Sequence, residues 1–339
     1  MSLIPFLHQV AGRRDLTAPD AQTAMGIILA GEASPAQIAA FVVALRMKGE
    51  SVGELAGFAR AMRQAARVVN AAGPLIDTCG TGGDGCGTFN ISTVASFVIA
   101  GAGVRVAKHG NRSISGGPGS ADLMESLGVK ISHDPDEMAR AIEQVGIAFL
   151  FAPAIHMAMK HAQAVRVDLK MRTVFNLLGP LTNPAGATAQ LVGAPSEATA
   201  ELMAGALAEL GLAHGFVVHG SDGLDEITTT GSTVAFEIQA GHVERRILEP
   251  ANFGVRTVTL ADLKGGDAAE NRDIARAVLS GEKGPHRDIV LVNASAALVA
   301  AGRAADFLEG MTMAARSIDS GAAMAKVDQL ARFTHGVAE

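Results

Sequence analysis

Beyond residue 74 the chain alternates between short apolar runs, typical of buried strands, and longer periodic segments, typical of helices. A strand that is followed by a helix and then by another strand usually forms a parallel pair, because the helix carries the chain back across the sheet. We therefore expect an α/β fold with a mostly parallel central sheet. The predicted strands span 75–78, 104–108, 146–151, 190–194 and 215–219, and the helices between them span 92–102, 119–127, 135–145 and 196–211.

The first seventy residues contain only helical patterns. Ser34 followed by Pro35 is typical of a helix start, with serine as the N-cap and proline at the first helical position. A glycine–proline pair at 73–74 then marks a boundary. We predict a small helical domain over 1–72, joined by part of 165–185, and a large α/β domain over 73–339.

The C-terminal half departs from the simple alternation. Three β-rich segments at 232–238, 243–248 and 255–260 indicate a small antiparallel excursion from the sheet. Helical patterns at 267–281, 286–302 and 304–334 then close the chain, and the last is expected to break near Ser320 and Gly321.

Composition excludes several classes of protein. A formal net charge of −6 over 339 residues argues against nucleic acid as the main partner. No apolar run approaches the ~18 residues of a membrane span, and the N-terminus lacks the apolar core of a secretory signal. The only cysteines, Cys79 and Cys86, form neither a disulfide framework nor a zinc motif. We expect a cytoplasmic protein without a membrane partner.

A glycine-rich stretch, GTGGDGCGTFNIST at residues 80–93, joins the first predicted strand of the α/β region to its first helix. Glycines let the backbone approach a ligand, and the first N–H groups of a helix lack partners within it, so this junction suits phosphate. The spacing matches neither GxxxxGK[ST] nor GxGxxG. Asp84 would repel a bare phosphate, which favours a sugar phosphate with the carboxylate facing a ribose hydroxyl or a metal. The alternative is a plain connector whose helix is capped by Asn90 or Ser92.

Two further loops follow predicted strands, where ligands of open α/β sheets bind. The stretch 108–120, KHGNRSISGGPGS, offers cations and hydroxyls beside glycines, and would hold a second phosphate unless it is a solvated basic turn. The stretch 219–226 contains Asp222, Asp225 and Glu226, which suit Mg²⁺ unless they form an acidic surface turn.

A fourth segment, 154–166, is predicted to be a helix. It carries His156, Lys160 and His161, whose histidines lack the i, i+4 spacing of a zinc helix. Arg166 at its end suits a carboxylate, because a guanidinium forms bidentate pairs. The stretch 172–184 reads as a loop that returns toward the helical domain.

Four motifs in this order, GTGGDGCGTFNIST, KHGNRS, RTVFNLLGPLTNP and DGLDE, resemble those of the anthranilate phosphoribosyltransferases, and the similarity runs from about residue 5 to about residue 330. The resemblance implies a nucleoside phosphorylase/phosphoribosyltransferase type of fold with the active site between the domains. It also implies transfer of the phosphoribosyl group of phosphoribosyl pyrophosphate (PRPP) to anthranilate in tryptophan biosynthesis, with two Mg²⁺ per subunit and a homodimer formed through the helical domain.

The resemblance also implies roles for individual residues. No covalent nucleophile is expected, and catalysis would be electrostatic, through Lys108 and Mg²⁺. Anthranilate would contact Gly80, Asn111, His156 and Arg166, and the metal ligands would be Ser92, Asp225 and Glu226. PRPP would contact Gly80, Gly83, Asp84, Thr88, Asn90, Ile91, Ser92, Thr93, Lys108, His109, Gly110, Asn111, Arg112, Ser113, Ile114, Ser115, Gly116 and Ser120.

Three departures from the family pattern affect this assignment. The run at 115–120 is SGGPGS where the family has SSKSGS, Met157 replaces a proline, and Lys170 stands where glycine is usual. Two other functions stay open: a pyrimidine nucleoside phosphorylase, which shares the glycine-rich motif more loosely, and a catalytically silent relative that binds nucleic acid. The net charge and the intact DGLDE loop argue against the latter.

Overall fold

A seven-stranded sheet forms the centre of the computed structural model, which describes residues 1–113 and 117–337. The strand order is β3-β2-β1-β4-β5-β6-β7. The first five strands are parallel and the last two are antiparallel, which confirms the predicted α/β class. The strands are β1 (Ile76–Gly80), β2 (Val106–Gly110), β3 (Ile147–Phe151), β4 (Ala189–Gly193), β5 (His214–Gly220), β6 (Thr233–Gln239) and β7 (His242–Leu248).

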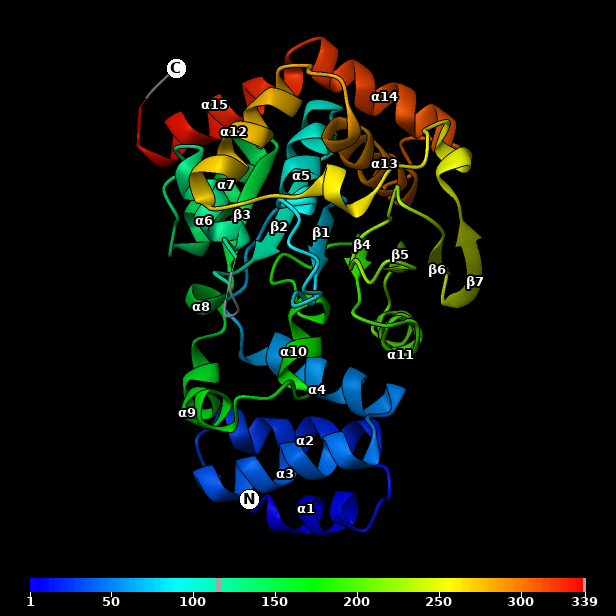
Figure 1. Cartoon of the computed structure of the whole chain (residues 1–339). Coiled ribbons are helices and arrows are strands. Elements are labelled where there is room, and N and C mark those ends of the chain that lie inside the picture. The colour runs from blue at the N-terminus through cyan, green and yellow to red at the C-terminus, as the bar shows by residue number, and fades with distance from the viewer. Residues whose placement is uncertain (114–116, 338–339) are drawn as a thin grey trace.

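Helices cover both faces of the sheet (Figure 1). Successive residues of a strand point to opposite faces, so Leu191 belongs to one apolar core and Val192 to the other. The first core includes α5 (Ile91–Gly101), α6 (Ser120–Ser126), α7 (Pro135–Gln144), α12 (Ala268–Leu279), α13 (Pro285–Ala300), α14 (Phe307–Asp319) and α15 (Ala322–Thr334).

The second core joins the opposite face of the sheet to the helical bundle at the lower end of Figure 1. Helix α11 (Glu197–Glu209) lies between them and contacts both α4 and β5. The other members are α1 (Ile4–Ala11), α2 (Ala18–Leu29), α3 (Pro35–Lys48), α4 (Val52–Ala65), α9 (Lys160–Leu169) and α10 (Phe175–Leu178).

Three local predictions were wrong. The segment 255–260 is not a strand: it is an extended connection that leads into a short 3-10 helix, Leu260–Leu263, and does not join the sheet. The predicted helix over 154–166 is broken at His156, where φ −97° and ψ 54° are not helical, into α8 (Ala152–Ile155), a 3-10 turn (Met157–Met159) and α9. The expected loop over 172–184 contains α10 and a further 3-10 turn, Gly179–Leu181.

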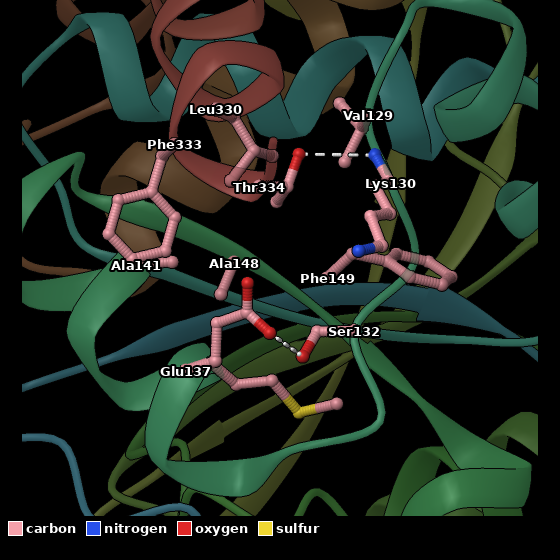
Figure 2. A pocket seen from close by; sticks show the side chains of 11 residues that line it. Val129, Lys130, Ser132, Glu137, Ala141, Ala148, Phe149, Leu330, Phe333 and Thr334 are labelled. Atoms are coloured by element: carbon pink, nitrogen blue, oxygen red, sulfur yellow. Dashed lines mark hydrogen bonds between the residues drawn. The ribbon is translucent and has the colours of Figure 1, made fainter. Parts of the chain in front are cut away.

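A small cavity of about 10 Å³ lies between β3, α7 and α15 (Figure 2). Its wall includes Lys130, Glu137 and Thr334, and the Ser132 hydroxyl donates to Glu137 Oε2 at 2.5 Å. A space of this size holds one water molecule at most, so it is not a substrate site. In the described part of the chain no helix is long and apolar enough to cross a membrane.

Candidate active site

The three candidate loops meet at one edge of the sheet. Strand β1 lies between β2 and β4 in parallel register, so the chain runs outward through β2 and β3 and then crosses to the other side of β1. Such a reversal of strand order opens a crevice at the carboxyl ends of the strands. The glycine-rich loop follows β1, the loop from Asn111 follows β2, and the acidic loop follows β5.

The glycine-rich loop is built around the carboxylate of Asp225. A side chain at residue 80 would clash with that carboxylate, so only glycine allows the close approach. The Gly82 amide donates to Asp225 Oδ2 at 2.9 Å. Gly82 and Gly83 have φ of 64° and 76°, a region that other residues rarely adopt. The Asp84 carboxylate accepts from the Cys86 amide at 3.2 Å and lies close enough to Asp225 to act on it electrostatically.

Asp225 and Glu226 are half-buried, and within the described residues neither forms an ion pair, although the charge of Arg172 acts on Asp225 and that of Lys108 acts on Glu226. Burial, followed by the charge of Asp84, raises the pKa of Asp225 to about 6. Burial, followed by the charge of Asp225, raises the pKa of Glu226 to about 8. Glu226 Oε1 accepts one hydrogen bond, from the Ser92 amide at 3.1 Å at the start of α5. These oxygens therefore keep capacity for a further ligand.

Asp222 has a different environment. Its Oδ2 accepts from the hydroxyls of Thr228 and Thr230 at 2.7 and 2.6 Å, and its Oδ1 accepts from the Leu224 amide. The third carboxylate of the acidic loop thus holds the loop itself together.

The donor set fits a hard divalent cation. Carboxylate and hydroxyl oxygens are the ligands that Mg²⁺ prefers, and Mg²⁺ commonly binds through one or two carboxylates while it keeps several waters or substrate phosphates. No cluster of three or more metal-ligating His, Cys, Asp or Glu side chains occurs within residues 1–113 and 117–337. Asp225, Glu226 and the Ser92 hydroxyl would therefore hold such an ion together with water and substrate oxygens.

Lys108 lies beneath the site. Its side chain is buried, and Nζ donates to the Thr78 carbonyl at 2.6 Å and to Ser92 Oγ at 3.4 Å. Burial lowers the pKa of Lys108, while the charges of Asp77 and Glu226 oppose that shift. The ammonium therefore places positive charge close to the carboxylates and to the start of α5.

Asn90 ties the first two loops together. Its Nδ2 donates to the Pro118 carbonyl at 2.9 Å, and its Oδ1 accepts from Asn271 Nδ2 at 3.1 Å. Its side chain does not cap α5, and neither does that of Ser92, which lies inside the helix. Ile91 is buried in the core, and the buried Thr93 hydroxyl has no partner in the described structure. Thr88 pairs with Lys264 in an isolated β-bridge.

The loop after β2 is held at both ends. The Ser120 hydroxyl donates to the Asn111 carbonyl at 3.1 Å, and the Gly110 backbone packs so tightly on Ser120 and Phe149 that a side chain would clash. Arg112 pairs with Asp122 and Glu125 at 2.7 Å, directed along α6. Ser113 is described, whereas the predicted contacts Ile114, Ser115 and Gly116 lie outside the described residues.

Two buried histidines face each other on the side of the helical bundle. The rings of His109 and His156 are 5.1 Å apart between centroids. Burial lowers the pKa of His109 to about 3 and that of His156 to about 4, so both rings are neutral. His109 Nδ1 lies 3.1 Å from the Gly179 carbonyl, which can only accept, so Nδ1 carries the proton and Nε2 is a bare acceptor. Neither Nε2 has a partner among the described residues.

Arg166 lies on α9, the helix that follows His156 in the sequence. Its guanidinium lies 5.8 Å from the centre of the Phe175 ring, and burial lowers its pKa. His156 lines a narrow crevice with Leu29 and Met62 of the helical bundle. This side of the site is thus formed by the segment between β3 and β4 together with α2 and α4.

Our sequence reasoning missed three residues. The buried Asp77 carboxylate accepts from the His109 amide at 3.0 Å and from Asn183 Nδ2 at 2.8 Å, which ties β1, β2 and the 179–183 turn together. Arg172 Nη1 donates to the Gly82 carbonyl at 2.7 Å. A carboxylate inside an apolar strand was a usable signal for Asp77. Arg172 begins the motif RTVFNLLGPLTNP, but its role could not be read from the motif, because its partner is a backbone atom 90 residues away.

Comparison with known proteins places this geometry in a family. The chain matches the glycosyl transferase family a/b domain over 72–324 and the glycosyl transferase family helical bundle domain over 4–66. It is 66% identical over 336 residues to an anthranilate phosphoribosyltransferase of Solibacter usitatus, covering 98% of this chain and 99% of that one.

Solved structures agree. The Thermus thermophilus anthranilate phosphoribosyltransferase superposes with a TM-score of 0.92 at 44% identity, covering 97% of this chain and 99% of that one. The Saccharomyces cerevisiae enzyme in complex with PRPP and Mg superposes with a TM-score of 0.90 at 28% identity, covering 98% of each chain.

Proposed function

The chain belongs to the anthranilate phosphoribosyltransferase family, and from this premise we propose that it transfers the phosphoribosyl group of PRPP to the amine of anthranilate. The products are N-(5-phosphoribosyl)anthranilate and pyrophosphate, in tryptophan biosynthesis. The observation that carries the proposal is the pair of half-buried carboxylates, Asp225 and Glu226, held against a glycine-rich loop by the Gly82 and Ser92 amides.

The PRPP side of the proposed site is the edge formed by the loops after β1, β2 and β5. Asp225, Glu226 and Ser92 would bind magnesium, which the PRPP and Mg bound to the yeast relative support. We propose two ions per subunit. The residues proposed to contact PRPP are Gly80, Gly83, Asp84, Thr88, Asn90, Ile91, Ser92, Thr93, Lys108, His109, Gly110, Asn111, Arg112, Ser113 and Ser120, with Ile114, Ser115 and Gly116 outside the described structure.

The acceptor side is proposed to consist of Gly80, Asn111, His156 and Arg166. A guanidinium suits the carboxylate of anthranilate. The bare Nε2 of neutral His109, near His156, can accept a hydrogen bond from the anthranilate amine and so orient its lone pair toward the ribose. Positioning of this kind is a large part of what an enzyme supplies to a displacement reaction.

The proposed reaction needs no covalent nucleophile. The amine lone pair attacks the anomeric carbon of PRPP as the bond to pyrophosphate breaks, and the amine then loses a proton. Neither cysteine is a nucleophile, because burial raises the pKa of Cys79 well above its ordinary value and that of Cys86 to about 11. Bound magnesium would neutralise charge on the leaving pyrophosphate. Lys108 and the amides at the start of α5 add fixed positive potential there.

Assembly and location are further parts of the proposal. The helical domain would span 1–72, with part of 165–185, and the α/β domain 73–339, in line with the two family matches. The contacts of α9 with α2 and α3 support the assignment of that segment to the helical domain. We propose a cytoplasmic homodimer that associates through the helical domain.

A steady-state assay with anthranilate, PRPP and Mg²⁺ tests the function. We expect anthranilate fluorescence to fall as the product forms, and no reaction upon addition of EDTA. Phosphorolysis of uridine or thymidine in place of this reaction would identify a pyrimidine nucleoside phosphorylase. Salt-sensitive DNA binding without any transfer would identify a catalytically silent nucleic-acid-binding relative.

A further inference from the structure

Arg172 reaches the glycine-rich loop from the segment that links α9 to α10. Its Nη1 donates to the Gly82 carbonyl at 2.7 Å. A Cβ atom at residue 83 would clash with the same nitrogen, so the guanidinium lies directly against the turn formed by Gly82 and Gly83. Both glycines have positive φ, and a turn of two such residues is not held by ordinary backbone preference.

The Gly82 residue is held from two sides. Its carbonyl accepts from Arg172, and its amide donates to Asp225 Oδ2 at 2.9 Å. The two bonds lie in adjacent peptide planes that meet at the Gly82 Cα, so together they restrain both planes around this residue. The Asp225 carboxylate of the proposed metal site is therefore linked to an arginine on the acceptor side of the molecule, through Gly82 and through the charge of Arg172, which acts on Asp225.

Within the described residues, the guanidinium of Arg172 has few polar contacts besides the hydrogen bond to Gly82. It forms no ion pair there, although its charge acts on Asp225, and its Nη2 is buried without a hydrogen-bond partner. An arginine that served only general stability would more commonly satisfy both terminal nitrogens. The hydrogen bond to Gly82 is therefore its principal polar contact.

We propose that Arg172 is a positioning residue for the PRPP and metal side of the site: it fixes the Gly82–Gly83 turn and, through the Gly82 amide, the Asp225 carboxylate. This inference rests on the proposed function. The segment between α9 and α10 adjoins the residues of the proposed acceptor side. Through Arg172, the same segment also sets the geometry of the PRPP and metal side of the crevice. Arg172 acts through Gly82 and is not itself a group that touches the reacting atoms.

The first test needs no substrate. Hydrogen exchange of the ligand-free protein is compared between wild type, Arg172→Gln and Arg105→Gln, a matched control in which Arg105 Nη1 donates to the Ala72 carbonyl at 2.6 Å far from the site. We expect the peptide containing Gly82 to exchange at least tenfold faster in Arg172→Gln, with β4 and the helical bundle unchanged. Unaltered exchange at Gly82, or faster exchange throughout the protein, would overturn the proposal.

The second test measures kinetics. In Arg172→Ala we expect kcat/KM for PRPP to fall about 10- to 100-fold, as is typical when a hydrogen bond from a charged group is lost, with KM for anthranilate within about twofold of wild type. Added guanidinium should restore part of the loss, and Arg172→Lys should retain more activity than Arg172→Gln. An effect confined to KM for anthranilate, or no rescue, would contradict the positioning role. Absence of transfer by the wild type would count against the proposed function alone, because the exchange test does not depend on it.

Discussion

Two parts of the molecule bury charge in opposite ways. In the helical bundle, Glu54 accepts from the Leu16 and Ser51 amides at 3.0 and 2.8 Å and pairs with Lys48 Nζ at 2.9 Å, while Lys48 also reaches Asp15. In the α/β domain, Asp225 and Glu226 lie half-buried side by side, and the neighbouring Lys108 donates to the Thr78 carbonyl and Ser92 instead.

The comparison distinguishes a structural charge from a functional one. Around Glu54 the charges and hydrogen bonds are matched, so the group closes the junction between α3 and α4 and needs no ligand. Asp225 and Glu226 have their pKa values raised because their anionic forms are under-compensated. A bound cation would relieve that deficit, so chemistry that would destabilise a core suits the proposed binding site here.

Removing the under-compensated carboxylates should have the largest effect, and that effect should be on turnover. Asp225→Asn combined with Glu226→Gln should lower kcat/KM by about 10³-fold, because the metal ligands are lost. The unfolding midpoint of the metal-free protein should not fall, since two repelling charges are removed. Circular dichroism and the steady-state assay check both points. Asp222→Asn is the matched control, and a comparable loss of turnover there would show that the acidic loop acts as a whole.

The corresponding change in the bundle should affect stability. Glu54→Ala leaves Lys48 with only its exposed partner Asp15 and removes the acceptor of the Leu16 and Ser51 amides, so it should lower the free energy of unfolding by about 3–5 kcal/mol. Asp15→Ala removes the exposed partner of the same lysine and should cost no more than about 1 kcal/mol. Urea unfolding measures both. Equal effects would mean that burial is not what separates the two carboxylates.

The histidine pair extends the comparison to pH. Neutral His109 and His156 have folded-state pKa values of about 3 and 4, below the ordinary 6.5, so the unfolded chain binds protons first as pH falls. Stability should be complete above pH 6.5 and decline between pH 6.5 and about 4, by up to about 1.4 kcal/mol per pH unit for each proton. His109→Gln should flatten this decline in metal-free protein. His8→Gln, at an exposed position on α1, should leave it unchanged.

The smallest expected effect is on stability, at the end of α9, which packs against the helical bundle. Lys170 ends α9 in the left-handed region, with φ 47° and ψ 34°, where glycine is the favoured residue. Lys170→Gly should raise the free energy of unfolding by about 0.5–1 kcal/mol, whereas Lys170→Ala should not, because alanine keeps the Cβ strain. Thermal unfolding compares the two variants. A gain for alanine equal to that for glycine would refute the strain.

Much of the fold could be predicted from the sequence because its signals are local. Periodicity located the five parallel strands, and Ser34 with Pro35 does begin α3, with the Ser34 hydroxyl accepting from the Gln37 amide. The segment 255–260 was misassigned because β-branched residues carry strand propensity whether or not a sheet edge is free to pair. The helix breaks at His156, whose ring meets that of His109 on β2, a contact between distant parts of the sequence that periodicity does not encode.

In the candidate site, too, features with a local sequence signal could be predicted, and features that depend on distant partners could not. The loops were found because glycine, lysine and carboxylate residues at strand ends have a chemical signature in sequence. Which carboxylate is structural was not readable, since Asp222 and Asp225 differ only in partners such as Thr228 and the Gly82 amide. The role of Arg172 depends on a backbone carbonyl, which carries no identity in a sequence.

The crossing of the chain from β3 at the sheet edge to β4 beside β1 has a consequence for how specificity can change. Residues 152–188 form this single crossing, and they carry His156, Arg166 and Arg172. The carboxylates and the glycine-rich loop lie on other connections. The part of the proposed acceptor side that this crossing carries, His156 and Arg166, can therefore be exchanged as one continuous module between two fixed strands, while Gly80 and Asn111 stay on the loops after β1 and β2. A new acceptor needs only to preserve the arginine that meets Gly82.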